Sequence, residues 1–128
     1  TRTFDVIVVG GGVLGLCTAW QLARRGVGRV ALVERFQVGH RHGSSHGHSR
    51  ITRTAYVEQS YVRLMQEVHS VDWPELQAAL GERLIHPSPG CLFGPAEGPF
   101  HRYADAVLAV GVDVDLIDGV FKFATVNP

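Results

Sequence analysis

The chain has 128 residues, of which 45% are hydrophobic and 19% charged, so it suits one packed domain or part of a larger one. Twelve basic and twelve acidic side chains cancel, which removes the electrostatic argument for a nucleic-acid partner or a membrane surface. No apolar run approaches the roughly 20 residues that span a bilayer. Cys17 and Cys91 fit no metal-binding spacing, so we expect two reduced, buried thiols in a cytoplasmic protein.

The N-terminal residues predict a strand, a glycine turn, a helix and a second strand. Phe4–Val9 is short, apolar and β-branched, as in a strand that is buried on both faces of a parallel sheet. Gly10–Gly15 (GGGVLG) leads into Leu16–Arg25, whose apolar residues recur at helical spacing until Gly26 can end the helix. Arg29–Glu34 is a second apolar run, and an acid closes it.

This order is typical of a dinucleotide-binding βαβ unit. Gly10 permits the tight turn, Gly12 lets the backbone approach a pyrophosphate, and Gly15 lets helix and strand pack closely. The helix N-terminus directs N–H groups and partial positive charge at the phosphates. Glu34, 19 residues beyond Gly15, can accept hydrogen bonds from ribose hydroxyls. We therefore expect an adenine dinucleotide, either FAD or NAD.

A histidine-rich segment follows, HRHGSSHGHSR, with His40, His42, His46 and His48 within nine residues. It could be a solvated loop, a metal site or part of the cofactor site. HxH and HxxxH spacings can bind zinc, but no cysteine lies nearby and the nearest upstream acid, Glu34, is assigned to the ribose. We therefore expect no metal, exposed loop positions for His40, His42 and His48, and a functional role for His46.

The second half predicts helices and short strands. Ser60–Val71 has apolar residues at helical spacing, and Asp72–Glu75 has the form of a capping box that starts a new helix ending near Gly81, with a kink or break at Pro74. Residues 82–86 and 90–94 read as two strands around a turn, with Cys91 packed in the second. Residues 99–111 predict a helix, and the alternating residues 112–117 predict a strand with one exposed face.

Three stretches of the sequence carry a resemblance to a known family. DVIVVGGGVLGLCTAWQLARRG, then LVERF, then GSSHGHSRITRTAYVE resemble the N-terminal part of the flavin-dependent amine oxidases of the monomeric sarcosine oxidase, N-methyltryptophan oxidase and pipecolate oxidase type. The resemblance covers roughly residues 4–117 and implies FAD. It implies an α/β fold with a Rossmann-like FAD-binding part (residues 1–82), the start of an α+β substrate-binding domain (83–117) that is incomplete, and an unmatched tail (118–128).

The resemblance also assigns site residues. Ser44, Ser45 and His46 fall where the family lines the pyrophosphate and the isoalloxazine, Arg50 falls beside the flavin ring, and Arg53 falls at an arginine that pairs with the substrate carboxylate. Glu58 falls on a loop near the active-site entrance. The residues implied to contact the cofactor are Gly10, Gly12, Val13, Gly15, Glu34, Arg35, Ser44, Ser45, Arg50 and Ile51, and those implied at the catalytic centre are Arg50, Arg53 and His46.

Charge and geometry agree with these two arginine roles. Arg50 and Arg53 stand three apart, the spacing of one helical face. A positive charge near the flavin pyrimidine stabilises the anionic reduced ring, and a second guanidinium can bind a carboxylate in bidentate geometry. Without the resemblance, two surface arginines on an amphipathic turn explain the spacing equally well.

The implied function is FAD-dependent oxidation of a secondary or cyclic amino acid at its C–N bond, with oxygen as acceptor and imine and hydrogen peroxide as products. We expect a small amino-acid substrate, no nucleic acid and no membrane. Because the family's proteins are longer, these 128 residues alone are expected to be inactive and to need a C-terminal part or a partner subunit. The alternatives are a non-catalytic dinucleotide-binding module and an NAD(P)-dependent dehydrogenase, although the latter leaves GSSHGHSR unexplained.

Overall fold

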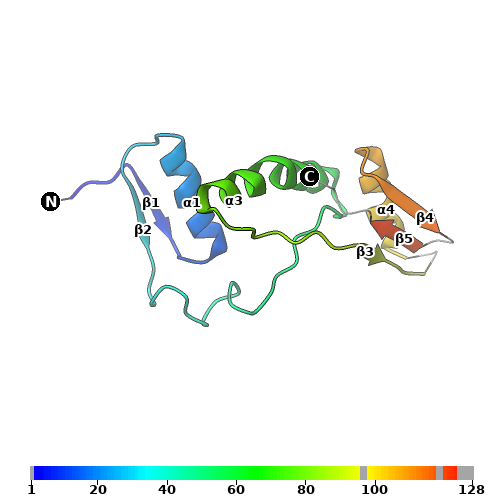
Figure 1. Cartoon of the computed structure of the whole chain (residues 1–128), viewed down its shortest axis with the longest axis horizontal. Helices are drawn as coiled ribbons and strands as arrows, with labels where there is room; N and C mark the ends of the chain where they lie inside the picture. The colour runs from blue at the N-terminus through cyan, green and yellow to red at the C-terminus, as the bar shows by residue number, and fades with distance from the viewer. Residues whose placement is uncertain (1, 96–97, 118–119, 124–128) are drawn as a thin grey trace. The chain divides into compact units, whose positions relative to one another are not determined.

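The computed structural model describes residues 2–95 and 98–117, and the backbone of residues 120–123. The chain divides into two compact units, Thr1–Ile51 and Thr52–Pro128 (Figure 1). Among the described residues there is no helix with the length and apolar character that a membrane span requires.

The first unit is a βαβ arrangement, as predicted. Strands β1 (Val6–Val9) and β2 (Val30–Val33) are parallel neighbours, with Val6 opposite Val30 and Val9 opposite Val33, and helix α1 (Val13–Arg24) connects them (Figure 1). The chain turns at Gly10, whose φ of +103° is a conformation that residues with a side chain rarely adopt. The glycine run therefore joins strand to helix in the way that the sequence predicts.

The close packing expected at Gly15 is present. A Cβ atom at this position would lie 1.8 Å from the carbonyl oxygen of Gly10, so only glycine fits where α1 crosses the turn. The helix ends as predicted, because Gly26 has a φ of +67° and the Val27 amide donates to the Leu22 carbonyl at 3.0 Å. Both ends of α1 are thus determined by glycines.

One face of this small sheet is covered and the other is open. In β1, Val6 and Val8 are half-buried, and a Cβ at Gly15 would contact Val8, which places these valines toward α1. Ile7 and Val9 alternate with them and are 59% and 82% exposed. The expected burial of β1 on both faces therefore does not hold within these residues.

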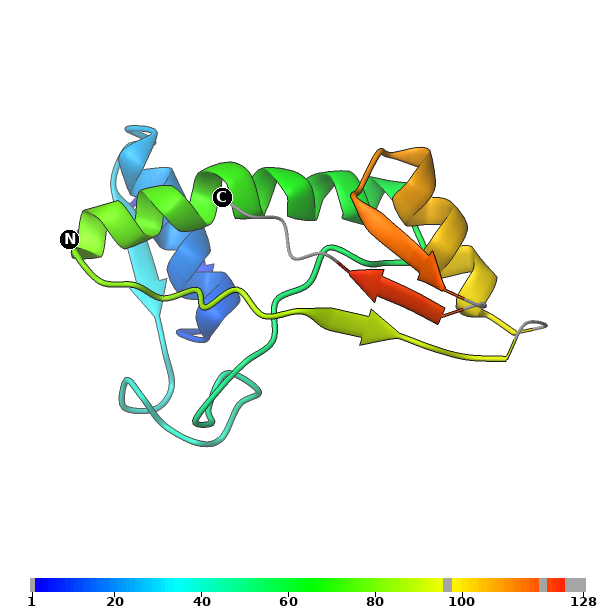
Figure 2. The ribbon, with the colours of Figure 1, turned by 45° about the vertical axis from the view of Figure 1, so that its right-hand side comes forward.

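The second unit contains a long helical segment. Helix α2 (Gln59–Glu67) continues through a π-helical turn, η1 (Val68–Asp72), into helix α3 (Trp73–Leu80), as one ribbon in Figure 2. The capping box predicted at Asp72 is wrong: Asp72 has helical dihedral angles and its side chain makes no capping hydrogen bond. Where the sequence predicts a kink or break at Pro74, a π-helical turn ends directly before α3, and Pro74 lies in the first turn of α3. The predicted end is confirmed, because Gly81 adopts a left-handed φ of +70°.

A three-stranded antiparallel sheet and one helix complete the second unit. The sheet order is β3-β5-β4, from strands Gly90–Leu92, Val120–Phe123 and Val114–Ile117, and helix α4 spans Phe100–Ala109 (Figure 1). The strand predicted over residues 82–86 does not form, since β3 pairs with the later β5 and not with its neighbour in sequence. The helix predicted over residues 99–111 forms as α4 and the strand predicted over residues 112–117 forms as β4, but Leu116, on the face expected to be covered, is 56% exposed.

Among the residues that the structure describes, the buried apolar ones all belong to the second unit. Val62 of α2 and Val107 of α4 are fully buried and pack with Ala55, Ala106 and Val112 in one cluster. Phe100 and Ala104 form a second cluster against Leu92. Cys17 is half-buried, but Cys91 is exposed, which corrects the expected packed thiol: in β3 the inward positions are Gly90 and Leu92, and alternation turns Cys91 outward.

Candidate functional site

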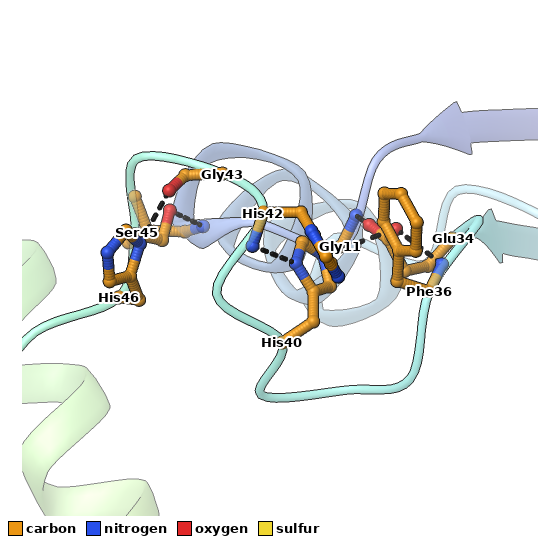
Figure 3. Close-up of polar contacts among 9 residues, drawn as sticks. Gly11, Glu34, Phe36, His40, His42, Gly43, Ser45 and His46 are labelled. Carbon is orange, nitrogen blue, oxygen red and sulfur yellow. Dashed lines mark hydrogen bonds and ion pairs between the residues drawn. The ribbon is translucent and has the colours of Figure 1, made fainter.

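The predicted cofactor residues meet where β1 and β2 end. Because the strands are parallel, their carboxyl ends lie at one edge of the sheet, which brings the glycine turn beside Glu34. The Gly10 amide donates to the Val33 carbonyl at 2.8 Å, extending the strand pairing by one step. The next amide, of Gly11, donates to Oε2 of Glu34 at 2.5 Å (Figure 3). The acid thus lies in direct contact with the turn that precedes α1.

Glu34 is a strong hydrogen-bond acceptor in this position. Its Oε1 accepts the Phe36 amide at 2.9 Å, while its Oε2 accepts the Gly11 amide. The hydrogen bond from Phe36, followed by that from Gly11, lowers the pKa of Glu34 from its usual 4.5 to about 2. The carboxylate is therefore ionised at every physiological pH, and an ionised carboxylate can only accept hydrogen bonds, which suits it to hydroxyl donors.

His40 also belongs to this cluster. The His42 amide donates to Nδ1 of His40 at 3.0 Å, so a neutral His40 ring carries its proton on Nε2, which lies 3.3 Å from Oε1 of Glu34 (Figure 3). The His40 ring is half-buried and its centroid lies 4.9 Å from that of Phe36. The expectation that His40 is an exposed loop residue is therefore wrong, whereas His42 is exposed as expected.

Nothing in the sequence pattern marked His40 as a neighbour of Glu34. The two residues stand six apart, a separation that brings side chains into contact neither along a helix, where contacting residues stand three or four apart, nor along a strand, where the two would lie about 20 Å apart. Their contact arises because the chain turns back on itself after β2. Only the folded loop, in which the His42 amide also contacts the His40 ring, identifies His40 as part of the site.

Ser45 ties the histidine-rich loop to the glycine turn. Its Oγ accepts the amide of Val13, the first residue of α1, at 3.0 Å. A Cβ placed on Gly12 would lie only 3.0 Å from the same Oγ, so the absence of a side chain at Gly12 lets the loop approach. The turn and a loop 32 residues further along the chain thus form one local structure.

The remainder of the loop is held by its own polar contacts. Nδ1 of His46 lies 2.6 Å from the Gly43 carbonyl, and since a carbonyl can only accept, this nitrogen carries the proton (Figure 3). Arg50 donates through Nη2 to the carbonyls of Ser44 and His46. Ile51, the last residue of the unit, is 92% exposed. Arg50 therefore stabilises the loop while its neighbour remains open to a ligand or to another part of the protein.

The remaining predicted residues lie outside this cluster of contacts. Arg35 is exposed, with its guanidinium carbon 5.3 Å from the centre of the Phe36 ring. Arg53 belongs to the second unit and stacks over Tyr56 at 5.0 Å. No helix forms around Arg50 and Arg53, so the expectation that they share a helical face is wrong. Glu58 precedes α2 and forms an exposed ion pair with Arg102 at 3.5 Å.

The histidines do not assemble a cluster of metal ligands. Within residues 2–95 and 98–117, no group of three or more His, Cys, Asp or Glu side chains is arranged to hold a metal ion. His40 turns its Nε2 toward Glu34, and His46 directs its Nδ1 toward a backbone carbonyl. Both rings thus use nitrogens for contacts within the loop.

The geometry at the turn fits an adenine dinucleotide. Gly12 presents bare backbone beside Ser45, α1 begins directly after it, and an ionised carboxylate stands at the end of β2. These are the features that bind a pyrophosphate and an adenosine ribose in βαβ units. The residues present therefore suit the cofactor that the sequence implies.

Comparison with known proteins decides between FAD and NAD. Residues 5–124 match the family described as FAD dependent oxidoreductase (DAO). The match extends seven residues past the end expected from the resemblance, into the tail. The boundaries at residues 82 and 117 within the chain stay a prediction.

Individual relatives point in the same direction. The peroxisomal sarcosine oxidase of Mus musculus is 36% identical over 121 residues, which are 94% of this chain and 30% of that protein. The monomeric sarcosine oxidase of Arthrobacter sp. (strain TE1826) is 35% identical over 92% of this chain and 31% of its own length. A solved structure of a mutant of NikD, an unusual amino acid oxidase essential for nikkomycin biosynthesis, superposes with a TM-score of 0.73 and 30% identity, covering 95% of this chain and 36% of that one.

These comparisons confirm the resemblance and its cofactor, FAD. They also confirm the α/β fold that the resemblance implies, and the chain's similarity to part of longer proteins. The chain spans about a third of the length of the relatives named above. It belongs to the FAD-dependent oxidoreductase family.

Proposed function

We propose that the full-length protein oxidises a secondary or cyclic amino acid, of the sarcosine or pipecolate kind, at its C–N bond, with oxygen as acceptor and imine and hydrogen peroxide as products. The proposal is supported chiefly by one observation: a FAD-family glycine turn is held against both Glu34 and Ser45, in a chain whose relatives carry the name sarcosine oxidase. When bound, FAD supplies the redox chemistry, by accepting a hydride equivalent from the carbon next to the nitrogen.

The first unit is proposed to bind the cofactor. Gly12 and the start of α1 at Val13 receive the pyrophosphate, with Ser44 and Ser45 of the loop beside it, and Glu34 accepts the ribose hydroxyls. Arg50 is the positive charge near the flavin ring. The contacts of Gly11 and Val13 with Glu34 and Ser45 support this proposal, because they preorganise the turn and the loop together.

Arg53 is proposed to bind the substrate carboxylate. A guanidinium presents a planar pair of N–H donors that matches a carboxylate, which an ammonium group does not. Arg53 is exposed and its guanidinium lies over the ring of Tyr56, a contact that restrains the side chain and leaves its edge free to donate. This arginine would distinguish amino acids from simple amines.

The test replaces Arg53 by lysine in the full-length enzyme. Loss of the bidentate contact is expected to cost on the order of 2–4 kcal/mol, or roughly 30- to 1000-fold in kcat/KM, with sarcosine. Dimethylamine, which lacks the carboxylate, is expected to lose much less, and bound flavin is expected to stay at the wild-type level. Steady-state peroxide release with both amines provides the measurement.

The control is Arg63→Lys, an exposed arginine on α2 that has no proposed role. Equal losses with both amines after Arg53→Lys would remove Arg53 as the carboxylate anchor. A full-length protein that binds flavin but turns over neither sarcosine, pipecolate nor related N-alkyl amino acids would favour a non-catalytic dinucleotide-binding module.

A further inference from the structure

His69 contacts the residues on both sides of Arg53. Its Nε2 lies 2.8 Å from the Thr52 hydroxyl, and its Nδ1 lies 3.2 Å from the Thr54 hydroxyl. Thr52 and Thr54 are half-buried and Arg53 between them is exposed, so the two hydroxyls face the histidine while the guanidinium faces away. One imidazole thus bridges two alternate residues of an irregular segment.

Neutral imidazole suits this bridge well. One ring nitrogen donates its proton and the other accepts, and a threonine hydroxyl can play either part, so both hydrogen bonds form in either tautomer. Burial lowers the pKa of His69, which keeps the ring neutral at pH 7. An apolar residue in its place would leave two half-buried hydroxyls without these partners.

The setting of His69 restricts its movement. It lies in η1, the π-helical turn between α2 and α3, and such turns occur frequently at functional sites. On the other side of the bridge, Ala55 is buried in the main core cluster and Tyr56 stacks with the Arg53 guanidinium. Arg53 is therefore held by a polar bridge to the residues on both sides of it and by the packing of Ala55 and Tyr56 just after it.

We propose that His69 is a positioning residue for Arg53: by bridging the Thr52 and Thr54 hydroxyls, it holds the backbone that aims the guanidinium at the substrate carboxylate. This inference rests on the proposed carboxylate-binding role of Arg53. His69 makes no contact with substrate in this scheme, and it acts through the geometry of Arg53 alone.

The experiment compares three variants of the full-length, flavin-loaded enzyme. His69→Leu removes both hydrogen bonds, and His69→Gln retains a donor and an acceptor. Ser70→Ala removes an exposed hydroxyl that donates to the carbonyls of Gln66 and Glu67 in the preceding turn. Each variant is assayed with sarcosine and with dimethylamine, and its affinity for acetate and for uncharged acetamide is measured at equilibrium by calorimetry.

His69→Leu is expected to raise the KM for sarcosine and to weaken acetate binding by about tenfold, the scale of one or two hydrogen bonds, with kcat changed by less than about twofold. Dimethylamine turnover, acetamide binding and flavin content are expected to stay at wild-type levels. His69→Gln is expected to recover most of the acetate affinity, and Ser70→Ala is expected to resemble the wild type. Equal effects on charged and uncharged ligands would overturn the proposal.

Two further comparisons keep the outcome interpretable. If His69→Leu does not fold, the double variant Thr52→Val with Thr54→Val removes the same hydrogen bonds from the other side and must reproduce the selective loss of acetate binding. If Arg53→Lys discriminates against carboxylates while neither the His69 nor the threonine variants do, the role of His69 is refuted and the function of Arg53 stands. If Arg53→Lys itself does not discriminate, the proposed function fails first.

Discussion

Single residues at the glycine turn have separable roles. Gly15 lacks space for any side chain because of a backbone carbonyl, so its requirement comes from folding. Gly12 has ordinary extended backbone angles and faces the Ser45 side chain, so its requirement comes from the space around the turn. Substitutions at the two glycines should therefore affect different measurements.

We predict that Gly12→Val in the full-length protein abolishes flavin retention. The added side chain would crowd Ser45 and fill the space where the pyrophosphate must approach. Flavin absorbance near 450 nm per mole of purified protein is the measurement. Leu16→Ala, at a partly exposed position of α1, is the control and is expected to lower stability slightly while flavin stays bound. Wild-type flavin content in Gly12→Val would contradict the placement of the cofactor.

Glu34 gives a second prediction, about pH. Its pKa is lower in the folded protein than the usual 4.5, so the ionised form stabilises the fold at pH values above 4.5, and this contribution is lost as the pH falls toward 2. In Glu34→Gln the side chain cannot ionise, and the contribution is missing at every pH. The stability difference between wild-type and variant apoprotein is therefore expected to be largest above pH 5 and to shrink between pH 4.5 and 2. Urea denaturation across this range measures it, and a constant difference would show that Glu34 has an ordinary pKa.

At the scale of elements, local sequence patterns predicted the helices and strands correctly where segments close in sequence pack together. The βαβ unit follows from two apolar runs, three glycines and one helical period, all within thirty residues. The prediction of a strand at residues 82–86 was wrong because strand pairing here is not local: β3 pairs with β5, about thirty residues later in the sequence. The capping box failed because Asp72 lies inside a continuous helical segment, and a D-x-x-E pattern does not reveal a π turn.

The residues of the candidate site also divide into those that the sequence pattern identifies and those that only the folded structure identifies. Gly10, Gly12, Gly15 and Glu34 could be recognised from spacing, since a dinucleotide imposes those positions. The contacts of His40 with Glu34 and of His69 with two threonines could not, because each depends on how an irregular segment folds back. Resemblance pointed to Ser45 and to the cofactor, and the loop geometry supplies the physical link between Ser45 and the turn.

The histidine-rich loop yields the third prediction, which concerns metal. Because His40 and His46 already direct ring nitrogens at Glu34 and at a backbone carbonyl, the purified protein is expected to contain no stoichiometric zinc or nickel. Elemental analysis measures this directly, and chelation is expected to leave flavin content and turnover unchanged. One tightly held metal ion per chain, lost on mutation of His40 and His42 together, would overturn the interpretation of the loop.

At the scale of the whole molecule, the two units differ in whether their described residues form a buried apolar core. The second unit contains every fully buried apolar residue in the described part of the chain, whereas the first has an apolar sheet with one open face. Relatives are about three times as long, and parallel sheets are generally covered on both faces. We therefore propose that the remainder of a longer protein covers the open face of β1 and β2.

We therefore predict that a protein made of these 128 residues alone binds a hydrophobic dye strongly and is inactive. Ile7 and Val9 project from β1 with more than half of their surface exposed, and such a face promotes association. Val9→Thr should reduce dye binding by the short protein. In the full-length enzyme the same substitution should cost on the order of 1 kcal/mol, because there the residue would be buried. Dye fluorescence and thermal unfolding measure the two effects.

The control variant is Val38→Thr. It shows whether a loss of stability in Val9→Thr comes from burial of Val9 by the rest of the protein or from the loss of any apolar side chain. Val38 is 78% exposed, close to the 82% of Val9, but it lies outside the sheet in the loop after β2. In the full-length enzyme, Val38→Thr is expected to leave the unfolding temperature unchanged, whereas Val9→Thr is expected to lower it. If both variants unfold at the same temperature as the wild type, the open face of β1 is not covered by the rest of the enzyme. A partner chain then becomes the better explanation for its apolar surface.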